Sequence, residues 1–170
     1  MTTTFRGGAP FGLGVAIATA AAVVDQAVKV WLRAGYQLSE QTPPLPLLGP
    51  FLDLRLAWNP GISLGLFRDS GGVLFAFQIV AVAVMTVWLM RTRSRFTGAA
   101  LGFIIGGAIG NMIDRVRYDR VMDFLHLKVP LGGGEPLSLF VFNLADAAIT
   151  AGVALLIYES LFMPDAAKAP

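Results

Sequence analysis

Residues 70–90 read SGGVLFAFQIVAVAVMTVWLM and hold no charged residue over 21 positions. About 20 predominantly apolar residues are enough to cross the hydrocarbon core of a bilayer as one helix. This stretch therefore predicts a transmembrane helix, and the composition of the chain agrees with it. Of the 170 residues, 55% are hydrophobic and only 14% are charged, whereas soluble domains carry about 25% charged residues.

Three further stretches are similarly poor in charge. Residues 7–24 and 96–113 carry none, and residues 136–158 carry one, Asp146. We expect an all-α membrane protein, a single integral membrane domain over residues 1–170 with four transmembrane helices at about 7–30, 70–90, 96–113 and 136–162. The longer connections, about 33–69 and 114–135, are expected to be external segments.

The first apolar stretch has an alternative interpretation. Arg6, the apolar run and the small residues Ala18-Thr19-Ala20 resemble a cleavable signal peptide. The apolar run continues past these residues to Val24, which favours a retained helix.

The orientation follows from the arginines of one short connection. Arg91, Arg93 and Arg95 lie between the second and third stretches, and short basic loops face the cytoplasm. Four spans then place both termini in the cytoplasm and the two longer connections outside. Residues 51–56 alternate apolar and polar side chains, so a small β-type cradle is expected on the external membrane face. In the third stretch, Gly102, Gly106 and Gly110 predict close packing of another helix.

Several kinds of site are excluded by residue counts. The chain has no cysteine and one histidine, His126, so disulfides, thiol catalysis and a zinc site of the H-E-x-x-H type are excluded. A net charge of +2 does not indicate nucleic-acid binding. We expect no metal and no cofactor.

Polar side chains inside or beside apolar spans are functional candidates by default. Asp146 lies about ten residues inside the fourth stretch, and the expected topology brings six polar residues to the external side: Asn111, Asp114, Arg115, Asp123, Asn143 and Asp146. Two carboxylates that share a site hold one proton between them and can activate a water, as in aspartic proteases. The residues alone leave the partner of Asp146 open, and Asp114 with Arg115 is expected to form an ion pair.

Four motifs in order carry a resemblance to a known family. They are DQAVK at 25–29, NPGISLGLF at 59–67, GGAIGNMIDR at 106–115 running on to VMDF at 121–124, and FNLADAAI at 142–149. The chain resembles the lipoprotein signal peptidases, or signal peptidase II family, from about residue 16 to 162.

The resemblance implies residue roles and an activity. The family's catalytic dyad falls on Asp123 and Asp146, its stabilising first motif on Asp25 and Lys29, and its site-lining or substrate-holding positions on Asn59, Gly61, Asn111, Asp114, Arg115 and Asn143. It implies an aspartyl endopeptidase of the bacterial inner membrane with its site on the external side. Such an enzyme removes signal peptides from prolipoproteins by cutting before a diacylglyceryl-modified cysteine. Membrane lipids and globomycin-type inhibitors are the other partners implied.

The chain departs from the family pattern at three places. Leu64 stands where an aromatic residue is common, Asp119 stands where glycine is common, and residues 128–139 form a longer, glycine-rich connection.

Two other functions are compatible with parts of the sequence. Residues 61–65 match the G-x-S-x-G pattern around Ser63, but a serine hydrolase needs a strand–turn–helix context and a histidine base, and we expect His126 to be a surface or interfacial residue. A small transporter or scaffold could use an intramembrane Asp for proton coupling, but no inverted repeat is visible.

Overall fold

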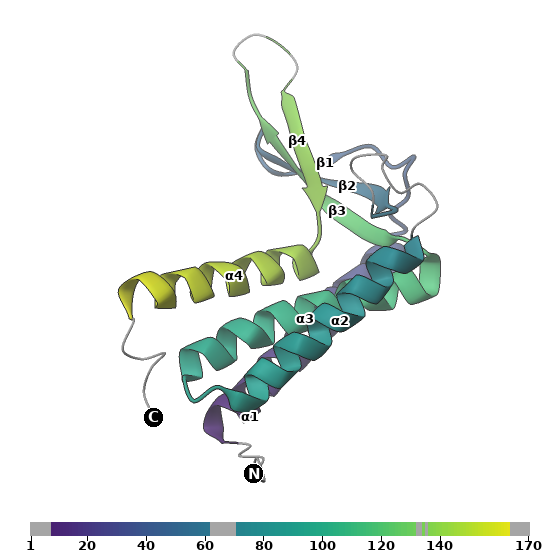
Figure 1. The fold of residues 1–170 in the computed structure, drawn as a ribbon. Coiled ribbons are helices and arrows are strands. Elements are labelled where there is room, and N and C mark those ends of the chain that lie inside the picture. Colours follow the sequence, from purple (N-terminus) through teal and green to yellow (C-terminus); the bar gives the residue numbers. More distant parts are fainter. Residues whose placement is uncertain (1–7, 62–70, 132–133, 135, 164–170) are drawn as a thin grey trace.

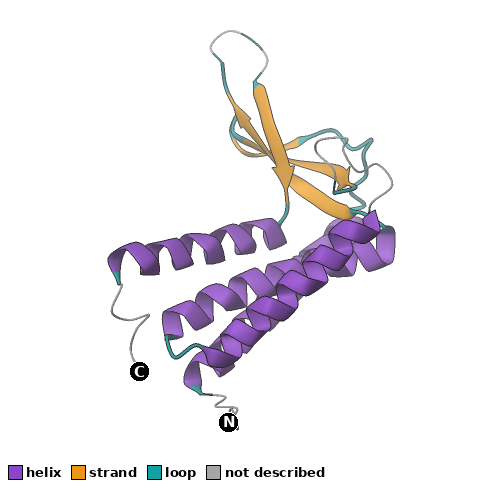
Figure 2. Cartoon of the chain, viewed as in Figure 1, coloured by secondary structure: helices purple, strands orange, loops and turns teal. Residues whose placement is uncertain are grey.

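A computed structural model describes residues 8–61, 71–131, 134 and 136–163 of the chain. Helices form one part of the molecule and a small antiparallel sheet stands at one end of them (Figures 1 and 2). In chain order the elements are α1 (Ala9–Val30), the π-helical turn η1 (Trp31–Gly35), β1 (Leu45–Leu48), β2 (Leu52–Asn59), α2 (Gly71–Arg91), α3 (Arg95–Tyr118), β3 (Val121–Val129), β4 (Leu137–Phe142) and α4 (Leu144–Phe162). The sheet lies where α3 ends and α4 begins, and the opposite end holds the start of α1 and the end of α4.

Helix α3 is the centre of the helical part, because α1, α2 and α4 all contact it. Its glycines allow this packing. A Cβ on Gly102 would lie 2.5 Å from the carbonyl oxygen of Gly14, and one on Gly106 would lie 2.4 Å from that of Ala18. The expected small-residue face is therefore confirmed, and α1 is the helix that packs on it. On another face of α3, the absence of a side chain at Gly107 lets the backbone of Ala145 in α4 approach equally closely.

Side-chain caps set both ends of α3. The hydroxyl of Ser94 accepts hydrogen bonds from the backbone N–H groups of Phe96 and Thr97, which are unpaired donors of the first turn. At the other end Asp119 ends the helix in the left-handed conformation, with φ of 57°. Glycine is common at such positions, and Asp is among the few other residues that adopt this conformation, because its short polar side chain can hydrogen-bond locally. The departure at Asp119 therefore keeps the turn that leads into β3.

The sheet has the order β1-β2-β3-β4 with every neighbouring pair antiparallel. Strands β2 and β3 pair Asn59 with Val121 and Ala57 with Asp123. A cluster of buried residues packs the sheet against the end of α1: Leu32, Leu38, Leu54, Leu56, Met122 and Phe124. The expected cradle is present, but it also takes two strands from the connection that precedes α4.

The start of the last helix differs from the prediction. We expected a helix from about residue 136, whereas Leu137–Phe142 is strand β4 and α4 begins at Leu144. A short apolar run fits a strand or a buried helix equally well by periodicity. Here β4 is hydrogen-bonded along β3, and Asn143 then caps the helix. At its other boundary the external connection also starts later than residue 114, since α3 continues to Tyr118.

Within the part of the chain that is described, three helical stretches are long and apolar enough to cross a membrane. They are Ala9–Gly35, Arg95–Tyr118 and Leu144–Phe162, with Phe75–Arg91 as a shorter apolar helix. Many large apolar side chains on the helices face outward, for example Phe77 and Leu161. Such a surface is unfavourable in water and favourable in lipid, so the fold is that of a membrane protein.

Candidate active site

Asp146 lies in the first turn of α4, and not deep inside a span as the sequence suggested. The backbone N–H of Asp146 donates to Oδ1 of Asn143 over 2.9 Å, and Oδ2 of Asp146 accepts from the backbone N–H of Asn143 over 3.2 Å. This reciprocal arrangement is a capping box. It fixes the Asp146 carboxylate at a helix N-terminus, where negative charge is favourable.

Asp123 comes to the same place from strand β3. It is only 2% exposed, and two asparagine amides hold its carboxylate. Nδ2 of Asn143 donates to Oδ1 over 2.7 Å, and Nδ2 of Asn59 donates to Oδ2 over 3.0 Å. Asn59 is the last residue of strand β2. The pairing of β2 with β3 places its amide beside Asp123, and Asp123 in turn contacts Asn143 at the start of α4.

Asn111 of α3 completes the link between the two carboxylates. Its Nδ2 donates to Oδ1 of Asp146 over 2.8 Å, and its Oδ1 accepts from Nδ2 of Asn143 over 3.1 Å. One chain of hydrogen bonds therefore runs from Asp123 through Asn143 and Asn111 to Asp146. The sequence left the partner of Asp146 open, and the fold brings Asp123 into that position.

The two carboxylates are electrostatically coupled. The pKa of Asp123 is raised from 3.8 to about 6, chiefly by burial and also by the negative charge of Asp146, while the amides of Asn59 and Asn143 act in the opposite direction. A carboxyl group with such a pKa holds and releases a proton near neutral pH. This is the property that acid–base catalysis requires.

Arg115 lies beside this pair but forms no ion pair with Asp114. Its Nη1 donates to Oε1 of Gln78 over 2.9 Å, and Nε2 of Gln78 donates to the carbonyl oxygen of Ala108 over 2.9 Å. Arg115 also interacts electrostatically with both Asp146 and Asp123. Gln78 was not among the predicted site residues, although it is the one amide side chain in the uncharged stretch 70–90.

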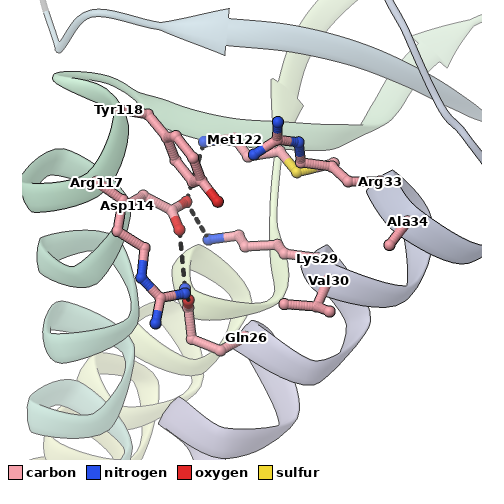
Figure 3. Close-up of a pocket in the computed structure, with 9 residues that line it drawn as sticks. All are labelled: Gln26, Lys29, Val30, Arg33, Ala34, Asp114, Arg117, Tyr118 and Met122. Atoms are coloured by element: carbon pink, nitrogen blue, oxygen red, sulfur yellow. Dashed lines mark hydrogen bonds and ion pairs between the residues drawn. The ribbon is translucent and has the colours of Figure 1, made fainter.

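Asp114 belongs to a second, fully buried cluster with the first motif. Nζ of Lys29 lies 2.7 Å from Oδ2 of Asp114 and 2.8 Å from Oδ2 of Asp25. Nε2 of Gln26 donates to Oδ1 of Asp114 over 2.8 Å, and Figure 3 shows the contacts of Asp114 with Lys29 and Gln26 between α3 and α1. Asp25 and Asp114 are 0% and 1% exposed, and the carboxylate of Asp114 is held by Lys29 and Gln26 of the first motif, so its part in lining the site of the aspartate pair stays a prediction.

The cluster is connected to the backbone beside each carboxylate of the pair. Oδ2 of Asp114 accepts from the backbone N–H of Met122 over 3.0 Å, and Oδ1 of Asp25 accepts from that of Ala145 over 3.1 Å. Met122 and Ala145 each directly precede one of the two coupled aspartates. Lys29 therefore joins two carboxylates that hold the two segments carrying Asp123 and Asp146.

Comparison with known proteins agrees with this geometry. Residues 17–162 match the signal peptidase II family. The chain belongs to the signal peptidase II family. Proteins called lipoprotein signal peptidase are similar to it over nearly their whole length. The one from Rhodopseudomonas palustris (strain ATCC BAA-98 / CGA009) is 44% identical, with 95% of this chain and 99% of the relative covered, and the one from Methylorubrum extorquens (strain PA1) is 45% identical, with 94% and 88% covered.

Solved structures show the same fold. A chain described as a bacterial membrane enzyme structure obtained by the in meso method at 1.9 Å resolution has a TM-score of 0.74. It is 24% identical, with 89% of this chain and 94% of that chain covered. By its family, this signal peptidase II family member is a membrane protease of the aspartic class.

In this signal peptidase II family member, two more of the predicted site residues, Asn59 and Gly61, contact each other. Oδ1 of Asn59 accepts from the backbone N–H of Gly61 over 2.8 Å, and Gly61 has φ of 86°, which favours glycine. Ser63 and Leu64 lie outside the described residues.

His126 is buried, whereas we expected a surface or interfacial position. Its Nε2 forms a hydrogen bond with the hydroxyl of Ser138 over 2.7 Å, and burial lowers its pKa.

Proposed function

We propose that the chain is a lipoprotein signal peptidase that cuts prolipoproteins before a diacylglyceryl-modified cysteine. The observation that carries this proposal is the buried chain of hydrogen bonds that joins Asp123 and Asp146 through Asn143 and Asn111. Two coupled carboxylates are the machinery of an aspartic protease, and this pair needs neither a metal nor a thiol.

In this proposal the pair activates a water held between the two carboxylates. The raised pKa of Asp123 supports its role as the initial proton holder, and the helix N-terminus supports negative charge on Asp146. Asp146 accepts a proton from the water as the water oxygen attacks the scissile carbonyl carbon. Asp123 donates its proton to the carbonyl oxygen. The tetrahedral intermediate then collapses: the C–N bond breaks, the leaving nitrogen takes the proton from Asp146, and one hydroxyl of the intermediate returns its proton to Asp123 as the C=O bond reforms.

The site-lining residues have separate tasks in this proposal. Asn59, Asn111 and Asn143 orient the two carboxylates, since each donates a hydrogen bond to at least one of them. Arg115 and Gly61 lie beside them and are proposed to hold the substrate backbone. Asp25 and Lys29 keep their proposed structural role and share it with Asp114.

The proposed membrane arrangement has four spanning helices in one integral domain. Helix α2 has 21 residues, about 31 Å at 1.5 Å per residue, which matches a bilayer core of about 30 Å. The pair of aspartates lies at the sheet end of the bundle, and Arg91, Arg93 and Arg95 lie at the other end. The positive-inside rule then supports cytoplasmic termini and an external site in the inner membrane. Lipids and globomycin-type inhibitors are proposed ligands of that site.

A gel-shift cleavage assay on a lipid-modified prolipoprotein tests the chemistry. We expect Asp123→Asn and Asp146→Asn each to lower kcat by about 10³-fold or more, because each removes one proton carrier. Asp119→Asn is the matched control. It makes the same chemical change at an exposed helix end whose left-handed conformation suits Asn, and it should retain full activity.

Three outcomes would contradict the proposal. Full activity of Asp123→Asn or of Asp146→Asn, in a preparation that elutes as the wild type does, would exclude the pair as the catalytic groups. Loss of activity in Ser63→Ala alone would favour the serine-hydrolase interpretation. Inhibition by chelators would indicate a metal.

A further inference from the structure

A cavity opens between α1 and α3 on the side that the catalytic pair does not use. It has a volume of about 260 Å³, and its walls come from α1, η1, the end of α3 and Met122 (Figure 3). None of the asparagines that hold Asp123 and Asp146 lines it. It lies where the helices end and the sheet begins, which in the proposed membrane arrangement is the level of the membrane–water boundary.

Three basic side chains, Lys29, Arg33 and Arg117, and one carboxylate, that of Asp114, line this cavity. Lys29 is paired with Asp114 and with the buried Asp25. The two guanidinium groups remain, and Figure 3 shows them on opposite walls, Arg33 from η1 and Arg117 from α3.

Both guanidinium groups have neutral partners. The Cζ of Arg33 lies 4.6 Å from the ring centroid of Tyr118 and 5.6 Å from that of Trp58. Nη1 of Arg117 donates to Oε1 of Gln26 over 3.3 Å. In residues 8–61, 71–131 and 136–163, no ion pair involves either arginine. Their charges are therefore available to an anion.

An apolar furrow continues from the basic cavity along α3. It has a volume of about 300 Å³ and is lined by Ile109, Met112, Ile113 and Val116, with Arg117 as the residue that it shares with the cavity. Val116 is 72% exposed, so the furrow is open to the surroundings of the helices. A cationic cavity at the membrane boundary that joins an apolar furrow toward the bilayer matches the two parts of an anionic lipid.

We propose that this surface binds an anionic phospholipid, with its phosphate on Arg33 and Arg117 and an acyl chain along the furrow. Basic pockets between transmembrane helices bind anionic headgroups, and Arg matches a phosphate with two parallel donors. The lipid would join α1 to α3 on the surface of the Lys29 cluster, away from the catalytic pair.

Native mass spectrometry of the full chain in neutral detergent tests the proposal. The protein is titrated with phosphatidylglycerol or with phosphatidylcholine of identical acyl chains. We expect the wild type to retain the anionic lipid about tenfold more strongly, and Arg33→Gln/Arg117→Gln to lose this preference. The matched control Arg91→Gln/Arg93→Gln removes two charges at the other end of the bundle and should keep it.

Two further arms keep the result interpretable. Val116→Trp changes an exposed side chain, leaves both arginines in place and should lower retention of the anionic lipid by filling the furrow. Soluble glycerol phosphate should not displace the lipid, since it has no chain for the furrow. Equal retention of the two lipids by the wild type would overturn the proposal, as would an unchanged preference in Arg33→Gln/Arg117→Gln. Displacement by glycerol phosphate would overturn the lipid as occupant.

Discussion

Lys29→Met removes the cation that joins two buried carboxylates. Nζ of Lys29 lies within 2.8 Å of both Asp25 and Asp114, and both acids are 1% exposed or less. Methionine keeps the length and apolar stem of lysine, so the change is mainly electrostatic. Removing one partner of a buried ion pair costs about 3–5 kcal/mol, because the remaining charge is uncompensated.

The loss can be measured as a shift in Tm. At about 2–4 °C per kcal/mol for a chain of this size, the expected decrease is about 6–20 °C. Arg91→Met is the matched control, since it removes one positive charge from an exposed side chain, and its effect should stay within about 0.5 kcal/mol. Thermal unfolding in one detergent, followed by loss of the monodisperse peak, compares the variants directly.

A triple variant separates charge from shape. Lys29→Met with Asp25→Asn and Asp114→Asn leaves no charge in the cluster, yet each Asn can still accept from the backbone N–H of Ala145 or Met122. We expect this variant to recover most of the lost stability, since neutral replacements of buried ion networks are well tolerated. If it is no more stable than Lys29→Met alone, the reasoning about unpaired charge is wrong.

Three further predictions concern other parts of the molecule. Asp123 has a folded pKa of about 6 against 3.8, so the folded state binds the proton more tightly, and wild-type stability should fall by about 2 kcal/mol between pH 4 and pH 6. Tm against pH should lack this slope in Asp123→Asn. Gly106→Ala places a Cβ 2.4 Å from the carbonyl oxygen of Ala18 and should lower the free energy of unfolding by about 1–3 kcal/mol, measured by thermal unfolding. In Gly12→Ala the new Cβ has no atom within 4 Å, so this variant should keep the wild-type stability. Glu159→Ala should lower Tm by the equivalent of about 1–3 kcal/mol, because the hydroxyls of Ser94 and Thr97 at the start of α3 lose the carboxylate that accepts their hydrogen bonds. Cleavage per folded molecule should stay unchanged.

The helices could be predicted from the sequence because lipid imposes a simple rule. A segment without charge that is long enough to cross a bilayer has few alternatives. The glycine face of α3 was also visible, since three small residues at a four-residue spacing share one helix face. The boundary between β4 and α4 at residue 143 could not be predicted, because an apolar run such as residues 137–142 is compatible with strand and helix until its pairing partner is known.

The candidate site divides in the same way. Burial cost alone singled out Asp146 and Asp114 as residues that need partners. Which partners they have depends on contacts far apart in the chain. Asp114 pairs with Lys29, and not with its sequence neighbour Arg115, because helix geometry points adjacent side chains in different directions.

By itself, then, the sequence determined that this chain lies in a membrane, and that a few of its carboxylates need charged or hydrogen-bonding partners there. The tertiary structure decided how they are satisfied. Strand β3 carries Asp123 to the N-terminus of α4, where Asn143 contacts both carboxylates of the pair. The physical reason is that local pattern specifies the environment of a residue, while a hydrogen-bond partner 20 or 120 positions away is specified only when the whole chain has packed.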